Sequence, residues 1–165
     1  MSGNPLSATD TTGLLEDFTY ELNSQPTSQL KCECGDTYQA FSGSGAGRND
    51  PRQASNSNVG PIPPGVYYIV DRPTGGRVGA LRDFFRPDKA DWFALYKKDG
   101  IVDDQTTIDG VLRGAFRLHY GSLSEGCITL SDKNAYARLY EKLRSTQTAT
   151  IPGTGITYYG TVTVK

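Results

Sequence analysis

The stretch that decides the fold is Pro61-Ile62-Pro63-Pro64-Gly65-Val66-Tyr67-Tyr68-Ile69-Val70. Proline restricts its own backbone, and that of the preceding residue, to extended conformations, and glycine then permits a turn. The run from Val66 to Val70 is apolar without interruption and has the length of a strand. It falls far short of the roughly 20 apolar residues that a membrane-spanning helix needs. We therefore predict a rigid lead into a buried β-strand and no membrane span.

Segments on both sides of this strand repeat a β pattern. In residues 17–23, Phe18, Tyr20 and Leu22 alternate with polar neighbours, which is typical of a half-buried strand. A turn-forming stretch, residues 24–28, separates this segment from a second alternating one. Strands are predicted over residues 17–23, 29–34, 37–42, 66–70, 92–97, 116–120 and 156–165.

One segment has helical spacing instead. Between residues 132 and 144 apolar side chains recur at intervals of three and four, at Ala135, Tyr136, Leu139, Tyr140 and Leu143. Ser131 is predicted to cap the N-terminus of this helix. The predicted fold class is mainly β with a minor α component: an antiparallel β-sandwich or barrel with one packed helix. Residues 1–16 are expected to be a loosely ordered lead-in, and residues 17–165 a single domain.

The charge balance excludes two classes of partner. With 17 Lys and Arg against 18 Asp and Glu, the net charge is −1, so we expect no nucleic-acid partner and no anionic-membrane partner. The first residues, MSGNPLSATDTT, have neither the basic region nor the apolar region of a general secretory signal. Synthesis in the cytoplasm without that export route is the expectation.

The three cysteines favour neither a disulfide framework nor a metal site. Cys32 and Cys34 stand two apart in a predicted strand and so share one face, which is poor geometry for bonding to each other. We expect them to be small buried hydrophobic residues. One histidine and this pair provide no tetrahedral ligand set at a recognised spacing, so no metal site is predicted.

His119, the only histidine, and Cys127 are eight residues apart on either side of a turn rich in Gly and Ser. If Phe116, Leu118 and Tyr120 point into the core, His119 lies on the opposite face of its strand, where the turn returns Cys127 to it. A free thiol is mostly protonated at neutral pH, and an imidazole that accepts its proton makes it a nucleophile. This pair is the predicted nucleophile and base, although a His beside a Cys is also often a packed pair without chemistry.

Two small residues of the turn have predicted supporting roles. Gly126 lets the backbone approach a substrate carbonyl closely, and amide groups of this turn are candidates for stabilising an oxyanion. Ser124 is expected to orient a ring nitrogen or a backbone amide. The long tract rich in Gly, Ser and Asn, residues 43–60, is predicted to be a functional loop, with a flexible flap as the alternative.

These motifs resemble the L,D-transpeptidase family of peptidoglycan enzymes. The resemblance lies in Ser124-Glu125-Gly126-Cys127-Ile128 after the strand with His119, and in residues 60–67 upstream. The chain is more similar still to a compact branch, the type VI secretion effectors with L,D-transpeptidase and L,D-carboxypeptidase activity. That similarity includes Phe-Ser-Gly-Ser-Gly at residues 41–45 and Arg113 at the start of the His119 strand.

The resemblance implies a function and a mechanism. Cys127 would attack the peptide stem at the L-centre of diaminopimelate, release the terminal D-Ala and form a thioester, with His119 as the general base. Water would then yield a trimmed stem, and an amine would yield exchange or a cross-link. A main-chain carbonyl of residues 120–121 would steady the second imidazole nitrogen, with Gly121 as support. No cofactor is expected, because a cysteine and a histidine suffice for acyl transfer.

The resemblance also implies partners and a destination. The substrate would be the peptide stem of peptidoglycan in the periplasm of a target bacterium, reached by a secretion-system carrier. An immunity protein would protect the producing cell by blocking the cleft.

The chain departs from the family pattern in ways that leave the substrate carboxylate without an assigned partner. Typical members have a longer spacing from His to Cys, a second His where this chain has Glu125, and an Arg where it has Thr129. Arg113 and Arg117 are the nearest basic candidates, and Tyr120 is a further candidate for substrate contact. Glu125 beside Cys127 would raise the thiol pKa, so we expect its side chain to point away.

Two other functions stay open on sequence grounds. A papain-like peptidase or cell-wall amidase usually has its cysteine on an early helix and its histidine much later, whereas here the order is reversed. A β module without catalysis, which binds glycan or protein through a tyrosine-rich surface, is the other alternative.

Overall fold

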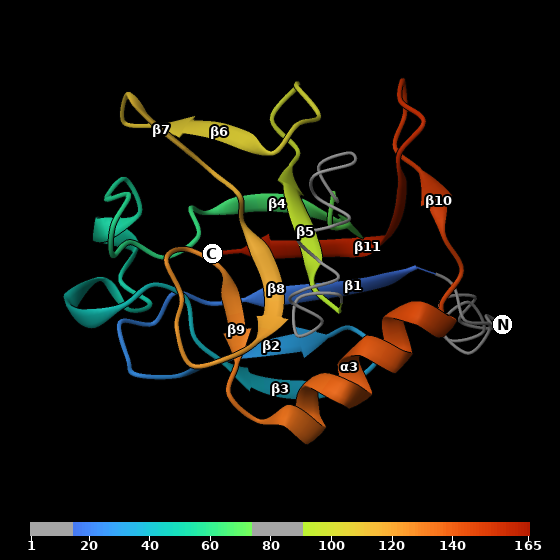
Figure 1. Ribbon diagram of the computed structural model, residues 1–165, viewed down its shortest axis with the longest axis horizontal. Coiled ribbons are helices and arrows are strands. Elements are labelled where there is room, and N and C mark those ends of the chain that lie inside the picture. The colour runs from blue at the N-terminus through green and yellow to red at the C-terminus, as the bar shows by residue number, and fades with distance from the viewer. Residues whose placement is uncertain (1–14, 74–90) are drawn as a thin grey trace, which may run out of the picture.

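The computed structural model describes residues 15–73 and 91–165. These residues form eleven strands, one α-helix and two short 3-10 turns (Figure 1). The strands are β1 Glu16–Tyr20, β2 Ser28–Cys32, β3 Thr37–Ala40, β4 Gly65–Asp71, β5 Phe93–Lys97, β6 Gln105–Ile108, β7 Val111–Gly114, β8 Arg117–Tyr120, β9 Ile128–Leu130, β10 Ala149–Thr150 and β11 Thr157–Val164. The helix is α3 Lys133–Ser145, and the 3-10 turns are η1 Gly45–Gly47 and η2 Pro51–Gln53.

The main sheet is nearly closed into a barrel. Its strand order is β3-β2-β1-β11-β4-β5-β8-β9, with β10 paired to β11. The two end strands meet where Phe41 bridges Thr129, with N–H···O distances of 2.9 Å in both directions. The predicted mainly β, barrel-like fold with one packed helix is therefore confirmed. Two of its strand pairs, β1 with β11 and β8 with β9, are parallel within an otherwise antiparallel arrangement.

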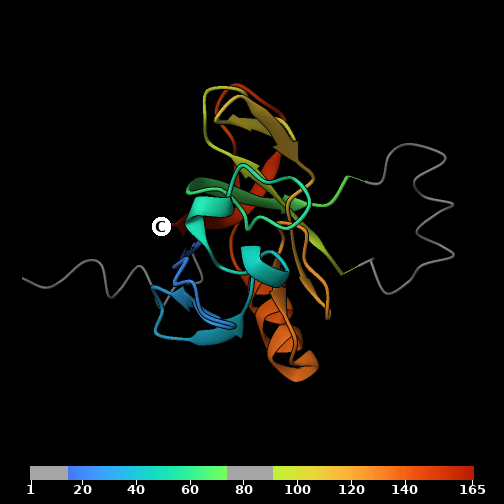
Figure 2. The same cartoon turned by 90° about the vertical axis from the view of Figure 1, so that its left-hand side faces the viewer.

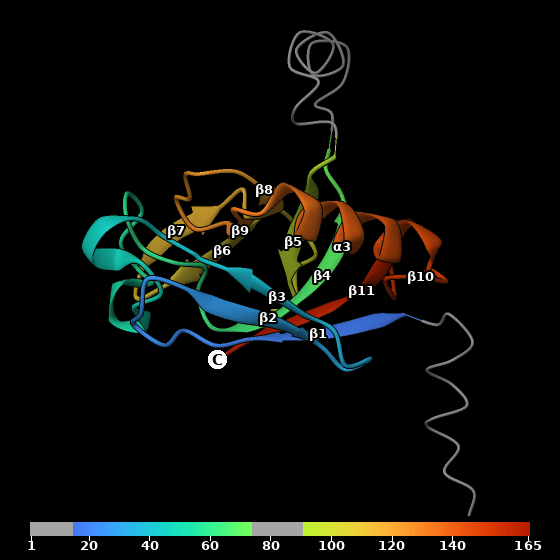
Figure 3. The ribbon, with the colours of Figure 1, turned by 90° about the horizontal axis from the view of Figure 1, so that it is seen from below.

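The core lies inside this barrel and under the helix. The apolar face of α3 buries Ala135, Tyr136, Leu139 and Leu143 against it. Figures 1 and 2 show α3 along one side of the barrel and the β6–β7 hairpin at the far end from it. Figure 3 shows the helix lying alongside β3, and it also contacts β8, β9 and β11. No helix of the described residues is long and apolar enough to cross a membrane.

The β6–β7 hairpin was absent from the sequence prediction. Its turn is Asp109-Gly110, and both residues have positive φ angles, 50° and 77°. An Asp-Gly pair between two short β segments is a strong hairpin signal, because its backbone twist matches that of the strands. This hairpin carries Arg113, so the expected position of Arg113 on the His119 strand is wrong.

Cys32 and Cys34 are joined in a disulfide, contrary to expectation. The prediction assumed a strand through residue 34, but β2 ends at Cys32, and Cys34 lies in the turn that follows. Because the chain turns between the two cysteines, their Cα atoms are closer together than in an extended strand. The Cα–Cα distance is 5.0 Å, which lies within the range of disulfides.

The tract of residues 43–60 is an ordered loop and not a flap. It contains η1 and η2, and its Asn49 is fully buried. The Asn49 side-chain oxygen accepts hydrogen bonds from the Tyr20 hydroxyl, at 2.5 Å, and from the Ser42 amide, at 2.9 Å. These buried contacts fix the loop to the barrel.

The cap of α3 differs from the prediction by one residue and yields a test. The Asp132 carboxylate accepts hydrogen bonds from the amides of Asn134 and Ala135, at 2.8 and 3.1 Å, whereas Ser131 is exposed. Asp132→Ala should lower the free energy of unfolding by about 1 kcal/mol, because it leaves two amides without their side-chain partner. Ser131→Ala is the matched control, and chemical denaturation measures both. Equal stabilities would contradict the assignment.

Candidate active site

Two parallel strands place the predicted nucleophile and base on one face. In the pairing of β8 with β9, His119 stands opposite Thr129, and Leu118 opposite Ile128. Leu118 and Ile128 are fully buried in the core, so His119 and Thr129 point to the other face. Cys127 immediately precedes β9 and shares the side of Thr129, two residues away. The register of β8 and β9 thus places Cys127, at the end of the turn, on the same face as the His119 imidazole.

His119 and Cys127 line one pocket of about 500 Å³. Its other lining residues are Ser44, Trp92, Tyr120, Gly121, Ser122, Leu123, Ser124 and Glu125. A larger groove of about 780 Å³ lies over β1, β2 and β3. That groove is lined by Thr, Asn, Gln, Lys, Glu, Ser and Tyr side chains and contains neither the cysteine nor the histidine. The chemistry therefore points to the smaller pocket.

The imidazole of His119 is fixed by the main chain beside it. Its Nδ1 lies 2.9 Å from the carbonyl oxygen of Tyr120, the contact expected for residues 120–121. A carbonyl oxygen only accepts hydrogen bonds, so Nδ1 carries the proton and donates it. The other nitrogen, Nε2, is then the basic one. Trp92 stacks on the ring with a centroid distance of 3.9 Å and holds its plane.

Thr129 contacts the basic nitrogen and was missed as a site residue. Its hydroxyl Oγ1 lies 3.2 Å from His119 Nε2, and the residue is fully buried. Since Nε2 has a free lone pair when Nδ1 is protonated, the hydroxyl donates to it. Sequence reasoning noted Thr129 only as the place of a missing arginine. Its position two residues after Cys127 was a usable signal, because that spacing puts both side chains on one face.

Cys127 is a partly buried free thiol. Burial raises its pKa above the ordinary value, and the charge of Glu125 adds to this, while a hydrogen bond from the Arg117 backbone and the charges of Arg117 and Arg113 lower it. The charge of Glu125 thus acts on the thiol in the direction expected of a neighbouring carboxylate, and burial has the larger influence on the thiol pKa. The resting state is accordingly a neutral thiol that needs a base to react.

Ser124 holds the turn in place through the backbone. Its hydroxyl accepts a hydrogen bond from the Gly43 amide, at 3.0 Å, and donates one to the Cys127 carbonyl, at 2.7 Å. Of the two partners predicted for Ser124, a ring nitrogen or a backbone amide, the hydrogen bond from Gly43 supports the backbone amide. Ser124 joins the loop of residues 43–60 to the residue that bears the thiol.

The two predicted glycines are explained by neighbouring side chains. Gly126 has a φ of 115°, and a Cβ there would collide with the guanidinium of Arg113 and lie 3.2 Å from the Phe116 ring. A Cβ on Gly121 would lie 3.3 Å from His119 Nδ1. The Gly121 amide donates to the Leu130 carbonyl at 3.0 Å, so that amide is committed to strand pairing. Close packing therefore explains why both positions are glycine, and the predicted approach of a substrate carbonyl to Gly126 is not needed to explain it.

Arg113 is a buried brace, which contradicts its expected contact with a substrate carboxylate. It is only 4% exposed, and its guanidinium donates to the carbonyls of Ala54, Gly60, Pro61 and Glu125 at 2.6 to 3.2 Å. A guanidinium with four carbonyl partners has no face left for a ligand. It ties the loop of residues 43–60 to the turn before Cys127.

Arg117 is likewise engaged, and Tyr120 is not a core residue. The Arg117 guanidinium makes a two-pronged pair with the Asp104 carboxylate, at 2.7 and 2.6 Å, which occupies two of its nitrogens. Tyr120 is 43% exposed and lines the pocket, contrary to its expected place in the core. Among the described residues that line the pocket, none is a lysine or an arginine.

Ser44 and Trp92 are further pocket residues that sequence reasoning did not assign to the site. Ser44 belongs to the Phe-Ser-Gly-Ser-Gly stretch, so the motif itself was a signal. Trp92 was seen only as the start of a strand, and nothing in its own segment indicates the imidazole on which it stacks.

Comparison with known families gives a match, which includes the candidate active site. Residues 36–154 match the Tlde1 domain, a span that includes His119 and Cys127. Comparison with curated proteins gives no match, and comparison with solved structures gives none. Because the match covers most of the chain, this protein belongs to the Tlde1 domain family, an L,D-transpeptidase-like family of type VI secretion effectors that act on peptidoglycan.

Proposed function

We propose that this chain removes the terminal D-Ala of peptidoglycan tetrapeptide stems, or exchanges it for another D-amino acid, through a thioester on Cys127. The observation that carries the proposal is the orientation of His119. Its Nδ1 is tied to the Tyr120 carbonyl, which makes Nε2 the basic nitrogen, and His119 lines the same pocket as Cys127. Family membership supports the substrate class.

The raised pKa of Cys127 favours proton transfer during attack over a preformed ion pair. As the sulfur bonds to the carbonyl carbon of the L-centre, its proton passes to His119 Nε2. The protonated imidazole then gives this proton to the leaving amine of D-Ala. Water or an amine next attacks the thioester, loses its proton to Nε2, and expels the thiolate, which is reprotonated from the imidazolium.

The walls of the pocket suit a small substrate side chain. Trp92, Tyr120 and Leu123 give it an apolar side, and Leu123 is 78% exposed. A methyl group such as that of D-Ala gains free energy by leaving water against such surfaces. With Arg113 and Arg117 engaged elsewhere, pocket hydroxyls such as those of Ser44 and Ser122, together with backbone amides, are the donors proposed for the terminal carboxylate.

The direct test uses purified tetrapeptide muropeptides, with and without an added D-amino acid, and mass spectrometry of the products. The full chain should release D-Ala and incorporate the added D-amino acid. Cys127→Ala should abolish both, and His119→Ala should lower the rate at least about a hundred-fold, because it removes the general base.

Circular dichroism and thermal melts of the variants establish that they are folded. Unchanged muropeptides with folded wild-type protein would overturn the proposal and favour the binding module. Activity that survives in Cys127→Ala would indicate a different peptidase chemistry.

The contact of Thr129 with Nε2 gives a second test. Thr129→Val keeps the shape of the side chain and removes the hydroxyl, so the imidazole loses the partner that holds its basic nitrogen. We expect kcat to fall about ten-fold with little change in KM, because misplacement of a base affects the chemical step. Thr129→Ser restores the hydroxyl and should recover most of the rate. Equal kcat values in Thr129→Val and the wild type would rule out this positioning role.

The pKa of Cys127 gives a third test, by alkylation with iodoacetamide across a pH series. Because burial raises this pKa, labelling should reach half its maximal rate at a higher pH than a free thiol does. Glu125→Gln removes a negative charge that opposes the thiolate, so it should move the midpoint to lower pH. Cys32 and Cys34 should not label without a reductant. A midpoint below that of a free thiol would contradict the neutral resting state.

A further inference from the structure

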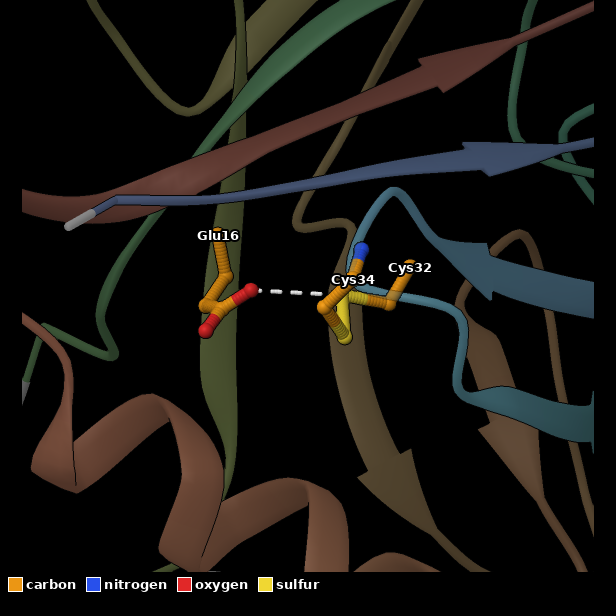
Figure 4. A group of neighbouring side chains, drawn as sticks. All are labelled: Glu16, Cys32 and Cys34. Atoms are coloured by element: carbon orange, nitrogen blue, oxygen red, sulfur yellow. Dashed lines mark hydrogen bonds between the residues drawn. A yellow bond between two sulfur atoms is a disulfide. The ribbon is translucent and has the colours of Figure 1, made fainter. Parts of the chain in front are cut away.

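A second group of reactive side chains lies away from the candidate active site, where β1 begins and β2 ends. Figure 4 shows the carboxylate of Glu16 pointing toward the sulfurs of Cys32 and Cys34. One ligand atom from each of the three residues lies within 4.8 Å of the others. From this arrangement we propose that the dithiol form of Cys32 and Cys34, with Glu16, is a binding site for one thiophilic divalent cation of the zinc class.

Strand pairing explains why the three side chains meet. Phe18 of β1 stands opposite Cys32 of β2 in an antiparallel pair. Just beyond this pair the Glu33 amide donates to the Asp17 carbonyl, at 2.9 Å, so the chain stays beside the start of β1 as it enters the turn that contains Cys34. The turn is held by hydrogen bonds from the Cys32 amide to the Asp36 carbonyl, at 2.8 Å, and from the Gly35 amide to the Cys32 carbonyl, at 3.0 Å. Backbone structure thus presents the donors together, independent of the bond between the sulfurs.

The position of the carboxylate fits the dithiol form better than the disulfide. Glu16 Oε2 lies 3.2 Å from Cys32 Sγ. A disulfide sulfur has no proton, so this close contact is not a hydrogen bond while the two cysteines are joined. In the dithiol form the thiol of Cys32 donates to the carboxylate, and in a metal complex both atoms bind the same cation. The other oxygen of Glu16, Oε1, lies 3.9 Å from the ammonium group of Lys142.

The chemistry of the donor set selects the cation. Two thiolates and one carboxylate are ligands that Zn²⁺ accepts in tetrahedral sites, with the fourth position left for water. Both thiols must lose their protons to bind the cation, and its charge offsets the repulsion among the two thiolates and the carboxylate. Cys32 is 6% exposed and Cys34 is exposed, so the pair is reached from the solvent on the Cys34 side.

The disulfide and the metal site use the same sulfur atoms and exclude each other. An external dithiol reduces the disulfide: two electrons and two protons pass to Cys32 and Cys34, and the external dithiol becomes a disulfide. Binding of Zn²⁺ then releases the two thiol protons and forms two zinc–sulfur bonds. The site therefore binds metal only under reducing conditions. It lies at one end of β3, whereas Phe41, just beyond the other end, pairs with Thr129 of the active site.

The test measures zinc binding and does not depend on catalysis. The full chain with Cys127→Ser, which removes the third sulfur, is reduced and titrated with Zn²⁺ against a chromophoric chelator. We expect one Zn²⁺ per chain in the reduced form and none in the oxidised form. Co²⁺ should give the near-ultraviolet bands of thiolate coordination. Glu16→Gln should weaken binding at least about ten-fold.

The matched control is Glu33→Gln, which changes the carboxylate between the two cysteines and leaves Glu16 in place. It should bind Zn²⁺ as the parent does. Circular dichroism establishes that each variant is folded, and protection of Cys34 from iodoacetamide by Zn²⁺ gives a second readout. If the reduced chain binds no better than a Cys32→Ser/Cys34→Ser chain, or if Glu16→Gln binds as tightly as the parent, the proposed three-ligand site is wrong.

Discussion

The active site depends on the two backbone hydrogen bonds between Phe41 and Thr129 that join the ends of the sheet. Each is 2.9 Å long, and both involve the residue whose side chain contacts the basic nitrogen of His119. Without this pairing β9 would be an edge strand held by β8 alone. A three-residue strand with one partner has little to fix it. Closure of the barrel therefore fixes the segment that begins immediately after Cys127.

Side-chain contacts extend this closure to the turn before the thiol. Arg113 ties the Glu125 carbonyl to two carbonyls of the loop of residues 43–60 and to that of Pro61 just after it. Ser124 ties the Cys127 carbonyl to the Gly43 amide. Buried charges and hydroxyls are stable only where partners surround them, so these contacts also require the loop to be ordered. A loop rich in glycine thus becomes a rigid wall of the pocket, through partners that lie far away in the sequence.

The sequence was informative where local pattern decides structure and less so where distant partners do. Alternation predicted β1 and β2, and the three-to-four spacing predicted α3, because each of these elements buries one face. The uninterrupted apolar run predicted β4. The buried triplet of β9 has no alternation, so no strand was predicted there. The proximity of His119 and Cys127 could be predicted because a single short turn joins them in the sequence. The engagement of Arg113 and Arg117 was unpredictable, since their partners are set by the β6–β7 hairpin and the loop of residues 43–60.

The raised pKa of Cys127 and the tethered imidazole together determine how the proposed nucleophile is controlled. A cysteine held as a thiolate reacts with any accessible electrophile, whereas a neutral thiol waits for a base positioned to take its proton. Here the proposed base, His119, has its Nδ1 next to a carbonyl oxygen and its Nε2 next to the Thr129 hydroxyl. The imidazole must exchange that hydroxyl for the thiol proton as the substrate carbonyl arrives. In the proposed mechanism the same imidazole nitrogen therefore serves first the Thr129 hydroxyl and then the thiol proton, and the thiol stays neutral until that transfer.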